Sequence, residues 1–168
     1  MSIVILGASG ILGSYLTTYL ANQDLQVIPI FRSEDFSKLR QTYYKSRNIS
    51  TIINCVALTN VDFCEKNINK AFNSNANYVK KILSEIWEPN INFVQISTDQ
   101  VYSGPGPHSE KDTSPLNVYG LTKLIGEEYS KELNPTILRI NYLAKSSNKS
   151  KLSFTDWLFN SLIKEKKM

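Results

Sequence analysis

A glycine-rich turn near the amino terminus constrains the fold of this chain more than any other segment. The apolar run 2–6 is typical of a strand, and the turn follows it directly. Apolar positions in the next segment, 11–23, repeat at helical spacing, and a second strand is expected over 26–31. The turn reads Gly7-Ala8-Ser9-Gly10-Ile11-Leu12-Gly13. Strand, glycine turn, helix and strand in this order predict the first unit of a parallel sheet covered by helices.

The three glycines of this turn each have a steric role. Gly7 permits a tight turn, Gly10 lets backbone N–H groups approach a pyrophosphate, and Gly13 lets the helix pack closely on the strand. A helix that begins near Gly10 also directs the positive end of its dipole at phosphates. The turn therefore predicts a dinucleotide site. Its candidate residues are Gly7, Ser9, Gly10, Ile11, Leu12 and Gly13.

The end of the second predicted strand bears on the choice of dinucleotide. An acidic residue there would bind the 2′-hydroxyl of NAD, whereas an arginine can accommodate the 2′-phosphate of NADP. The chain has Phe31-Arg32-Ser33 at this point, so the acid is absent and a cation is present. Arg32 favours NADPH over NADH, although NADH stays possible and an ordinary surface charge is the alternative role for this arginine.

The rest of the chain alternates between strand-like and helix-like segments. Further strands are expected over 51–54, 92–97 and 136–139, and further helices over 35–45, 69–85, 119–132 and 153–166. This alternation predicts an α/β fold, a Rossmann-type doubly wound parallel sheet flanked by helices. Residues 1–145 would form this NAD(P)-binding domain, and residues 146–168 a basic linker and a terminal helix.

A second group of residues suggests proton transfer. The apolar run 94–96 ends at Ser97-Thr98-Asp99, as expected of a buried strand that delivers polar groups at its carboxyl end. Tyr119 and Lys123 lie four residues apart on a predicted helix, which places the ammonium beside the phenol. A tyrosine pKa is normally about 10, and a neighbouring cation favours the phenolate. A chain this rich in both residues contains about one such pair by chance, so Tyr119 can equally be an amphipathic helix-start residue and Lys123 a solvated charge.

Longer runs resemble the extended short-chain dehydrogenase/reductase family, and within it the dTDP-4-dehydrorhamnose reductase group. The run 97–102 matches the group's Ser-Thr-Asp-x-Val-Phe/Tyr motif, and 114–123 matches the entry to its catalytic helix almost residue for residue. The run 54–59 is similar to the group's Asn-Ala-Ala-Ala motif with its following x-Thr pair. Val61, Asp62, Glu65 and Asn75 also fall at the group's spacing. The likeness covers nearly the whole chain.

This resemblance implies roles for particular residues. Tyr119 would protonate the oxygen of a sugar carbonyl that accepts a hydride from nicotinamide, and Thr98 would hydrogen-bond the developing alkoxide. Lys123 would hold the nicotinamide ribose and lower the tyrosine pKa. Asp99 would contact the sugar, and Tyr142 would stack on it. The alternative for Thr98 and Asp99 is that they only cap the loop after the strand.

The resemblance also extends the expected cofactor site beyond the glycine turn. The adenine would meet Asp35 and Phe36, and the remaining contacts would come from Ala57, Leu58, Thr59, Tyr119 and Lys123. Asn75 has two interpretations, an organiser of a water for proton relay or a residue on a helix surface.

The chain departs from the group's pattern after residue 144. Reductases of this group run much longer, and the expected Tyr-Gly is replaced by a lysine- and serine-rich segment. The last predicted helix then carries an apolar face, Phe154, Trp157, Leu158 and Leu162, that needs to be covered by the sheet or by a partner segment. We therefore expect a truncated substrate part, with a homodimer or a complementing carboxyl-terminal segment as possible partners.

Composition excludes several other classes of function. The 168 residues suit one domain, no apolar run is long enough to span a membrane, and no leader precedes the first strand, so a cytoplasmic protein is expected. Cys55 is expected to act as a small apolar residue and Cys64 to lie in a polar loop, and neither they nor His108 suggest a metal site. The net charge of +4 is concentrated in the last residues, where isolated lysines do not predict nucleic-acid binding.

Three functions remain open from the sequence. The first is an NADPH-dependent reductase of a nucleotide-linked 4-keto sugar in polysaccharide and nucleotide-sugar biosynthesis, including that of dTDP-rhamnose. The second is a nucleotide-sugar epimerase or dehydratase of the same family. The third is a truncated cofactor-binding or regulatory protein, because a sugar that is not fully enclosed would react in a wet and poorly oriented site.

Overall fold

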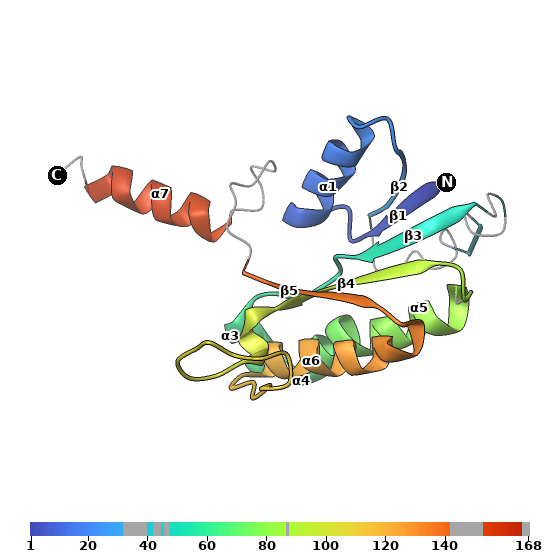
Figure 1. Ribbon diagram of the computed structural model, residues 1–168. Coiled ribbons are helices and arrows are strands. Elements are labelled where there is room, and N and C mark those ends of the chain that lie inside the picture. The colour runs from blue at the N-terminus through green and yellow to red at the C-terminus, as the bar shows by residue number, and fades with distance from the viewer. Residues whose placement is uncertain (32–39, 42–44, 46–47, 87, 142–152, 166–168) are drawn as a thin grey trace.

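The computed structural model describes residues 1–31, 40–41, 45, 48–86, 88–141 and 153–165 of the chain, which form a twisted parallel sheet with helices on both faces (Figure 1). Its strand order among the described residues is β2-β1-β3-β4-β5. The strands are β1 (Ser2–Leu6), β2 (Gln26–Ile30), β3 (Ile49–Asn54), β4 (Asn92–Thr98) and β5 (Thr136–Ile140). All four neighbouring pairs run parallel, so the predicted α/β doubly wound sheet is confirmed.

The described helices divide between the two faces of the sheet. Helix α1 (Ile11–Ala21) covers one face at β1 and β2, and a layer of helices covers the other face (Figure 1). That layer comprises α3 (Val61–Lys66), α4 (Ile68–Phe72), the π-helix η1 (Asn73–Asn77), α5 (Tyr78–Ile86) and α6 (Val118–Ser130). Short 3₁₀ turns follow β4 at η2 (Asp99–Val101) and α6 at η3 (Lys131–Leu133).

The core lies between the sheet and this helical layer. Val4 and Leu6 of β1, Ile52 of β3 and Phe93 of β4 pack with Ile82 of α5, all buried. Strands covered on both sides carry continuous apolar runs, which is why the local pattern of these segments predicted them as strands. Burial of this cluster places β1 inside the sheet, with β2 on one side and β3 on the other.

The chain reverses its direction of winding at β1. Helix α1 leads to β2 on one side of β1, whereas β3 lies on the other side. The connections leaving the carboxyl ends of β1 and β3 therefore diverge, and a crevice opens where ligands of such sheets bind. Gly7 follows β1 at this point, and Cys55 follows β3, its N–H donating to the carbonyl of Leu6 at 3.0 Å.

Most predicted element boundaries agree with the structure to within two residues, but the segment after β3 differs. The helix predicted over 69–85 is built from α4, η1 and α5, and α3 before it was not predicted. Asn60 caps α3 by accepting a hydrogen bond from the N–H of Phe63 at 2.7 Å. Cys64 lies on α3 and is fully buried, so its expected place in a polar loop is wrong. The predicted helix 35–45 falls mostly outside the described residues.

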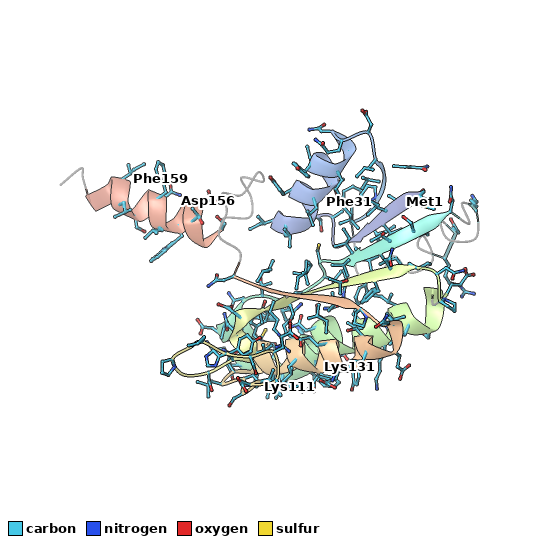
Figure 2. The ribbon with its side chains drawn as sticks, viewed as in Figure 1. Met1, Phe31, Lys111, Lys131, Asp156 and Phe159 are labelled. Atoms are coloured by element: carbon cyan, nitrogen blue, oxygen red, sulfur yellow. The ribbon has the colours of Figure 1, made fainter. Side chains whose placement is uncertain are left out.

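Helix α7 (Phe154–Glu165) extends away from the sheet (Figure 1). Trp157, Leu158 and Leu162, three members of the apolar face expected from the sequence, are exposed. Figure 2 shows Phe159 on the same helix, also exposed, clear of the strands. The sheet therefore does not cover this face in the arrangement described.

We expect Gly126→Ala to destabilise the fold. A Cβ at Gly126 would lie well inside van der Waals contact of the backbone oxygen of Asn75, so α6 and η1 would have to separate. Overpacking of this kind costs about 1–3 kcal/mol, which outweighs the better helix propensity of alanine. Chemical denaturation measures the change, and Gly106→Ala is the control because its Cβ meets nothing closer than 3.6 Å. Equal stability of the two variants would contradict the close packing.

Candidate active site

The glycine turn is held by short contacts to both neighbouring strands. Gly7 has a φ of 78°, the left-handed region that favours glycine, and a Cβ there would meet the backbone of Val56 and Cys55 at 3.0–3.2 Å. The N–H groups of Gly7 and Ala8 both donate to the carbonyl of Ile30, at 3.0 and 2.9 Å. These contacts turn the chain sharply out of β1 and start α1 beneath the crevice.

The amino terminus of α1 is open toward that crevice. As in any α-helix, the first-turn N–H groups of Ile11, Leu12 and Gly13 have no intrahelical acceptor. The N-cap, Gly10, has no side chain that could accept a hydrogen bond from them. A Cβ at Gly13 would collide with the carbonyl of Gly7, so only glycine lets the helix approach the turn this closely. Unpaired N–H groups at the positive end of a helix suit an anionic group such as pyrophosphate.

A cleft of about 1030 Å³ runs from this helix end to the carboxyl ends of β3, β4 and β5. Ten of the residues predicted to form the site line this one cleft. They are Gly10, Ile11, Leu12, Gly13, Ala57, Thr59, Thr98, Asp99, Tyr119 and Lys123. Gly7, Ser9 and Leu58 are not part of its lining. Arg32, Asp35, Phe36 and Tyr142, also predicted from the sequence, lie outside the described residues.

Thr98 forms the cap that was considered for it. It is the last residue of β4, its Oγ1 caps the turn η2 by accepting from the N–H of Gln100 at 3.2 Å, and it donates to Asp99 Oδ1 at 3.2 Å. Thr98 and Tyr119 line the same cleft, and the Thr98 hydroxyl acts to lower the pKa of the phenol. The capping interpretation is therefore confirmed, and the cap also places a hydroxyl beside the candidate acid.

The pKa of Tyr119 is displaced in the direction opposite to that expected from the sequence. The side chain is only 9% exposed, and burial raises its pKa, while the hydrogen bond with Thr98 opposes the rise and the nearby Cys64 and Asp99 add to it. Lys123 is not among the groups that lower this pKa, because its ammonium is directed elsewhere. Tyr119 therefore keeps its proton at neutral pH in this state.

Lys123 is buried at 2% exposure, so its interpretation as a solvated charge is wrong. Its Nζ donates to the backbone carbonyl of Ile96 on β4 at 2.5 Å. Burial lowers the pKa of Lys123 to about 8, while Glu127 and, to a lesser extent, Cys55 favour the charged form. The ammonium is thus held at the base of the cleft with its charge only partly compensated.

Three polar contacts fix the amino terminus of α6, which carries Tyr119. Asn117 caps the helix by accepting from the N–H of Gly120 at 2.7 Å, and its amide donates to Gln100 Oε1 at 2.9 Å. Glu65 of α3 accepts from the N–H of Val118 at 2.7 Å. These bonds tie the start of α6 to η2 and α3, so the phenol is positioned by the fold rather than by its own contacts.

Asn75 lies inside the π-helix and is 1% exposed, so its interpretation as a helix-surface residue is wrong. Its side chain accepts from the N–H of Leu58 at 2.7 Å and donates to the carbonyl of Leu58 at 3.2 Å and to Thr122 Oγ1 at 3.0 Å. A π-bulge is frequent at functional sites. Here it lets one amide join the segment after β3 to the helix of Tyr119 and Lys123.

An ion pair behind the cleft, with a buried carboxylate, was not predicted from the sequence. Glu127, on α6, accepts hydrogen bonds from Arg139 of β5 and from the hydroxyl of Ser97 on β4. The signal was present, since Glu127 follows Lys123 by four residues, as Lys123 follows Tyr119. Asn141, which donates to Asp99 Oδ2 at 3.0 Å, is a further residue of the cleft that was not predicted as a site residue.

The described residues offer neither a metal centre nor a membrane-spanning helix. No three histidine, cysteine, aspartate or glutamate side chains within the described ranges are grouped to hold a metal ion. No helix in the described part of the chain combines the length and apolar character that a bilayer crossing requires.

Proteins similar in sequence to this chain include several reductases. The chain is 29% identical over 93% of its length to the probable low-salt glycan biosynthesis reductase of Haloferax volcanii, and covers 59% of that protein. It is 38% identical to the dTDP-4-dehydrorhamnose reductase of Salmonella typhimurium over 76% of the chain and 46% of that enzyme.

Solved structures show the same likeness. A dTDP-4-dehydrorhamnose reductase of Clostridium acetobutylicum superposes with a TM-score of 0.81 at 30% identity, over 96% of this chain and 59% of that one. The Bacillus anthracis enzyme in complex with NADP gives a TM-score of 0.81 at 27% identity, over 99% of this chain and 60% of that one. The chain thus spans about three fifths of the length of these two structures.

The family assignment confirms the resemblance seen in the sequence motifs. The family model described as RmlD substrate binding domain matches residues 1–166, nearly the whole chain. The glycine turn, the Ser-Thr-Asp run and the Tyr-x-x-x-Lys helix all lie inside this match and meet in one cleft. The chain belongs to the RmlD substrate binding domain family.

Proposed function

We propose that this chain is the cofactor-binding and catalytic part of an NADPH-dependent reductase of a nucleotide-linked 4-keto sugar. The observation that carries the proposal is that Thr98, Tyr119 and Lys123 line the same cleft as the open amino terminus of α1. A dinucleotide site and a proton donor are the two parts that such a reduction requires. Their meeting in one cleft is not expected if either motif had arisen by chance.

The glycine turn would hold the pyrophosphate of the cofactor. The first-turn N–H groups of α1 provide donors, and Gly10 and Gly13 leave the backbone accessible. Ala57 and Thr59 would continue the binding surface along the end of β3, where they line the cleft. The preference for NADPH rests on Arg32 and agrees with the NADP in the Bacillus anthracis relative.

Bound nicotinamide would supply a hydride to the carbonyl carbon at position 4 of the sugar. Tyr119 would deliver a proton to the carbonyl oxygen, and its raised pKa means that it carries this proton at neutral pH. Thr98 would donate a hydrogen bond to the oxygen as negative charge develops there. Lys123, held at the base of the cleft by the carbonyl of Ile96, would hold the nicotinamide ribose and help to stabilise the phenolate that remains.

The sugar would lie at the carboxyl ends of β4 and β5. Asp99 and Asn141 form a hydrogen-bonded pair at this edge of the cleft, and both can exchange their mutual bond for sugar hydroxyl groups. We assign residues 1–145 to the dinucleotide-binding domain, and the segment from residue 146 to a linker and terminal helix leading to the substrate part. The chain spans about three fifths of the length of these relatives. Turnover is therefore tested with the chain alone and with a complementing segment added.

The preference for NADPH is tested at Arg32. Arg32→Ala is expected to weaken NADPH binding by about ten- to a hundredfold, because a charge-assisted hydrogen bond to the 2′-phosphate contributes about 1.5–3 kcal/mol. NADH, which lacks this phosphate, should bind as before. Fluorescence titration of both cofactors measures the two affinities, with Arg40→Ala as a matched surface control. Parallel losses for NADPH and NADH would contradict a role at the 2′-phosphate.

The acid role of Tyr119 is tested with Tyr119→Phe. We expect at least a hundredfold loss of dTDP-4-dehydrorhamnose reduction with unchanged NADPH affinity, since general acids contribute about 10²–10⁴-fold. NADPH oxidation is followed for the chain alone and with the carboxyl-terminal two fifths of the Clostridium acetobutylicum reductase added. Tyr129→Phe, on the same helix, is the control. NADPH binding without turnover in either mixture would leave only the cofactor-binding function.

A further inference from the structure

We infer that Glu127 is a positioning residue for Lys123, and that its buried carboxylate keeps the ammonium charged and fixed against β4. The two residues lie four apart on α6 and are buried at 1% and 2% exposure. As a contribution to catalysis this inference rests on the proposed function. The effect of Glu127 on Lys123 is a property of the protein without cofactor and can be measured separately.

Strand β4 provides neighbouring anchors for the two side chains. Lys123 Nζ donates to the carbonyl of Ile96 at 2.5 Å, and the hydroxyl of Ser97, the next residue, donates to Glu127 Oε1. The ammonium and the carboxylate are therefore both pinned to one segment of backbone. This arrangement fixes how far α6 can slide along β4, and with it the height of Lys123 in the cleft.

The hydrogen bonds that Glu127 accepts come from residues other than Lys123. Arg139 Nε donates to both carboxylate oxygens at 3.1 and 3.2 Å, and Nη2 donates to Oε2 at 2.6 Å. With the Ser97 hydroxyl, these donors occupy the carboxylate. Glu127 therefore acts on Lys123 through its charge, which is weakly screened in a buried site, rather than through a direct ion pair.

The charges around Lys123 determine whether its pKa is raised or lowered. Burial lowers the pKa of Lys123 to about 8, and Glu127 is the larger of the two influences that oppose this, ahead of the thiol of Cys55. Tyr119 and Asp99 line the same cleft. Without the carboxylate charge, little would oppose the effect of burial, and the pKa of Lys123 would fall further below its ordinary value.

Arg139 provides a test that separates this role from a purely structural one. It carries the opposite charge and shares the same ion pair, so losing either partner leaves a buried charge unpaired and destabilises the protein. Loss of Glu127 and loss of Arg139 should change the pKa of Lys123 in opposite directions. Glu127→Gln removes a negative charge and should lower the pKa of Lys123, whereas Arg139→Gln removes a positive charge and should raise it.

The experiment is an NMR titration of the cofactor-free protein labelled with ¹³C,¹⁵N-lysine. In the natural sequence one lysine should titrate near pH 8, and Lys123→Met should remove that signal. Glu127→Gln should shift the titration to lower pH, Arg139→Gln to higher pH, and Glu127→Asp should restore it toward the natural value. Shifts of the same sign in the Gln variants, or no shift, would overturn the inference.

A double variant guards against failure of the single variants to fold. Glu127→Leu with Arg139→Met replaces the ion pair by apolar side chains, which is often neutral for stability. Glu127 is the first of the groups that raise the pKa of Lys123, so with its charge removed the titration should still fall below that of the natural protein. An unchanged titration overturns the inference. Absence of NADPH binding would instead reject the proposed function and leave this titration unaffected.

Discussion

The site depends on how closely helix α6 approaches the backbone around it. Gly120 lies against the carbonyl of Gln100 and Gly126 against that of Asn75, in both cases with no room for a Cβ. These contacts hold the helix at two points on either side of Lys123. Tyr119 and Lys123 are consequently placed by backbone packing, and their chemistry follows from where the helix lies. The same device recurs at Gly13, which lets α1 approach the turn at Gly7.

Close packing also determines which protonation states of Tyr119 and Lys123 are favoured. Burial raises the pKa of Tyr119, and burial lowers the pKa of Lys123 to about 8. Desolvation penalises the charged form of each, so the phenol is kept neutral and the ammonium becomes easier to deprotonate. A neutral phenol is the form that can donate a proton to a carbonyl oxygen while a hydride is added to the carbon. The spacing of tyrosine and lysine alone could not show this, since it carries no information on burial.

Local sequence pattern predicted the sheet, its turn and the residues that line the cleft at Thr98, Tyr119 and Lys123, because each has a local cause. Strands buried on both faces have continuous apolar runs, and the glycine turn has steric demands that the sequence displays. Cys64 and Asn75 were misplaced for the opposite reason, since their burial depends on segments far away in the chain. Glu127 was overlooked although its spacing from Lys123 was visible. A charged residue at helical spacing is normally solvated, and only its partner Arg139, on another element, makes it a core residue.

Arg139 extends the influence of this ion pair to the loop that precedes α6. Besides Glu127, its Nη1 donates at 2.7 Å to the hydroxyl of Tyr102 and at 2.7 Å to the carbonyl of Glu110. The loop is closed at its base where the N–H of Ser114 donates to the carbonyl of Val101 at 2.8 Å. One guanidinium thus connects β5, the loop and α6. The hydrogen bonds with Glu127 and Tyr102 raise the pKa of Arg139 further above its already high value, so the guanidinium stays charged, whereas burial lowers the pKa of Lys123 to about 8.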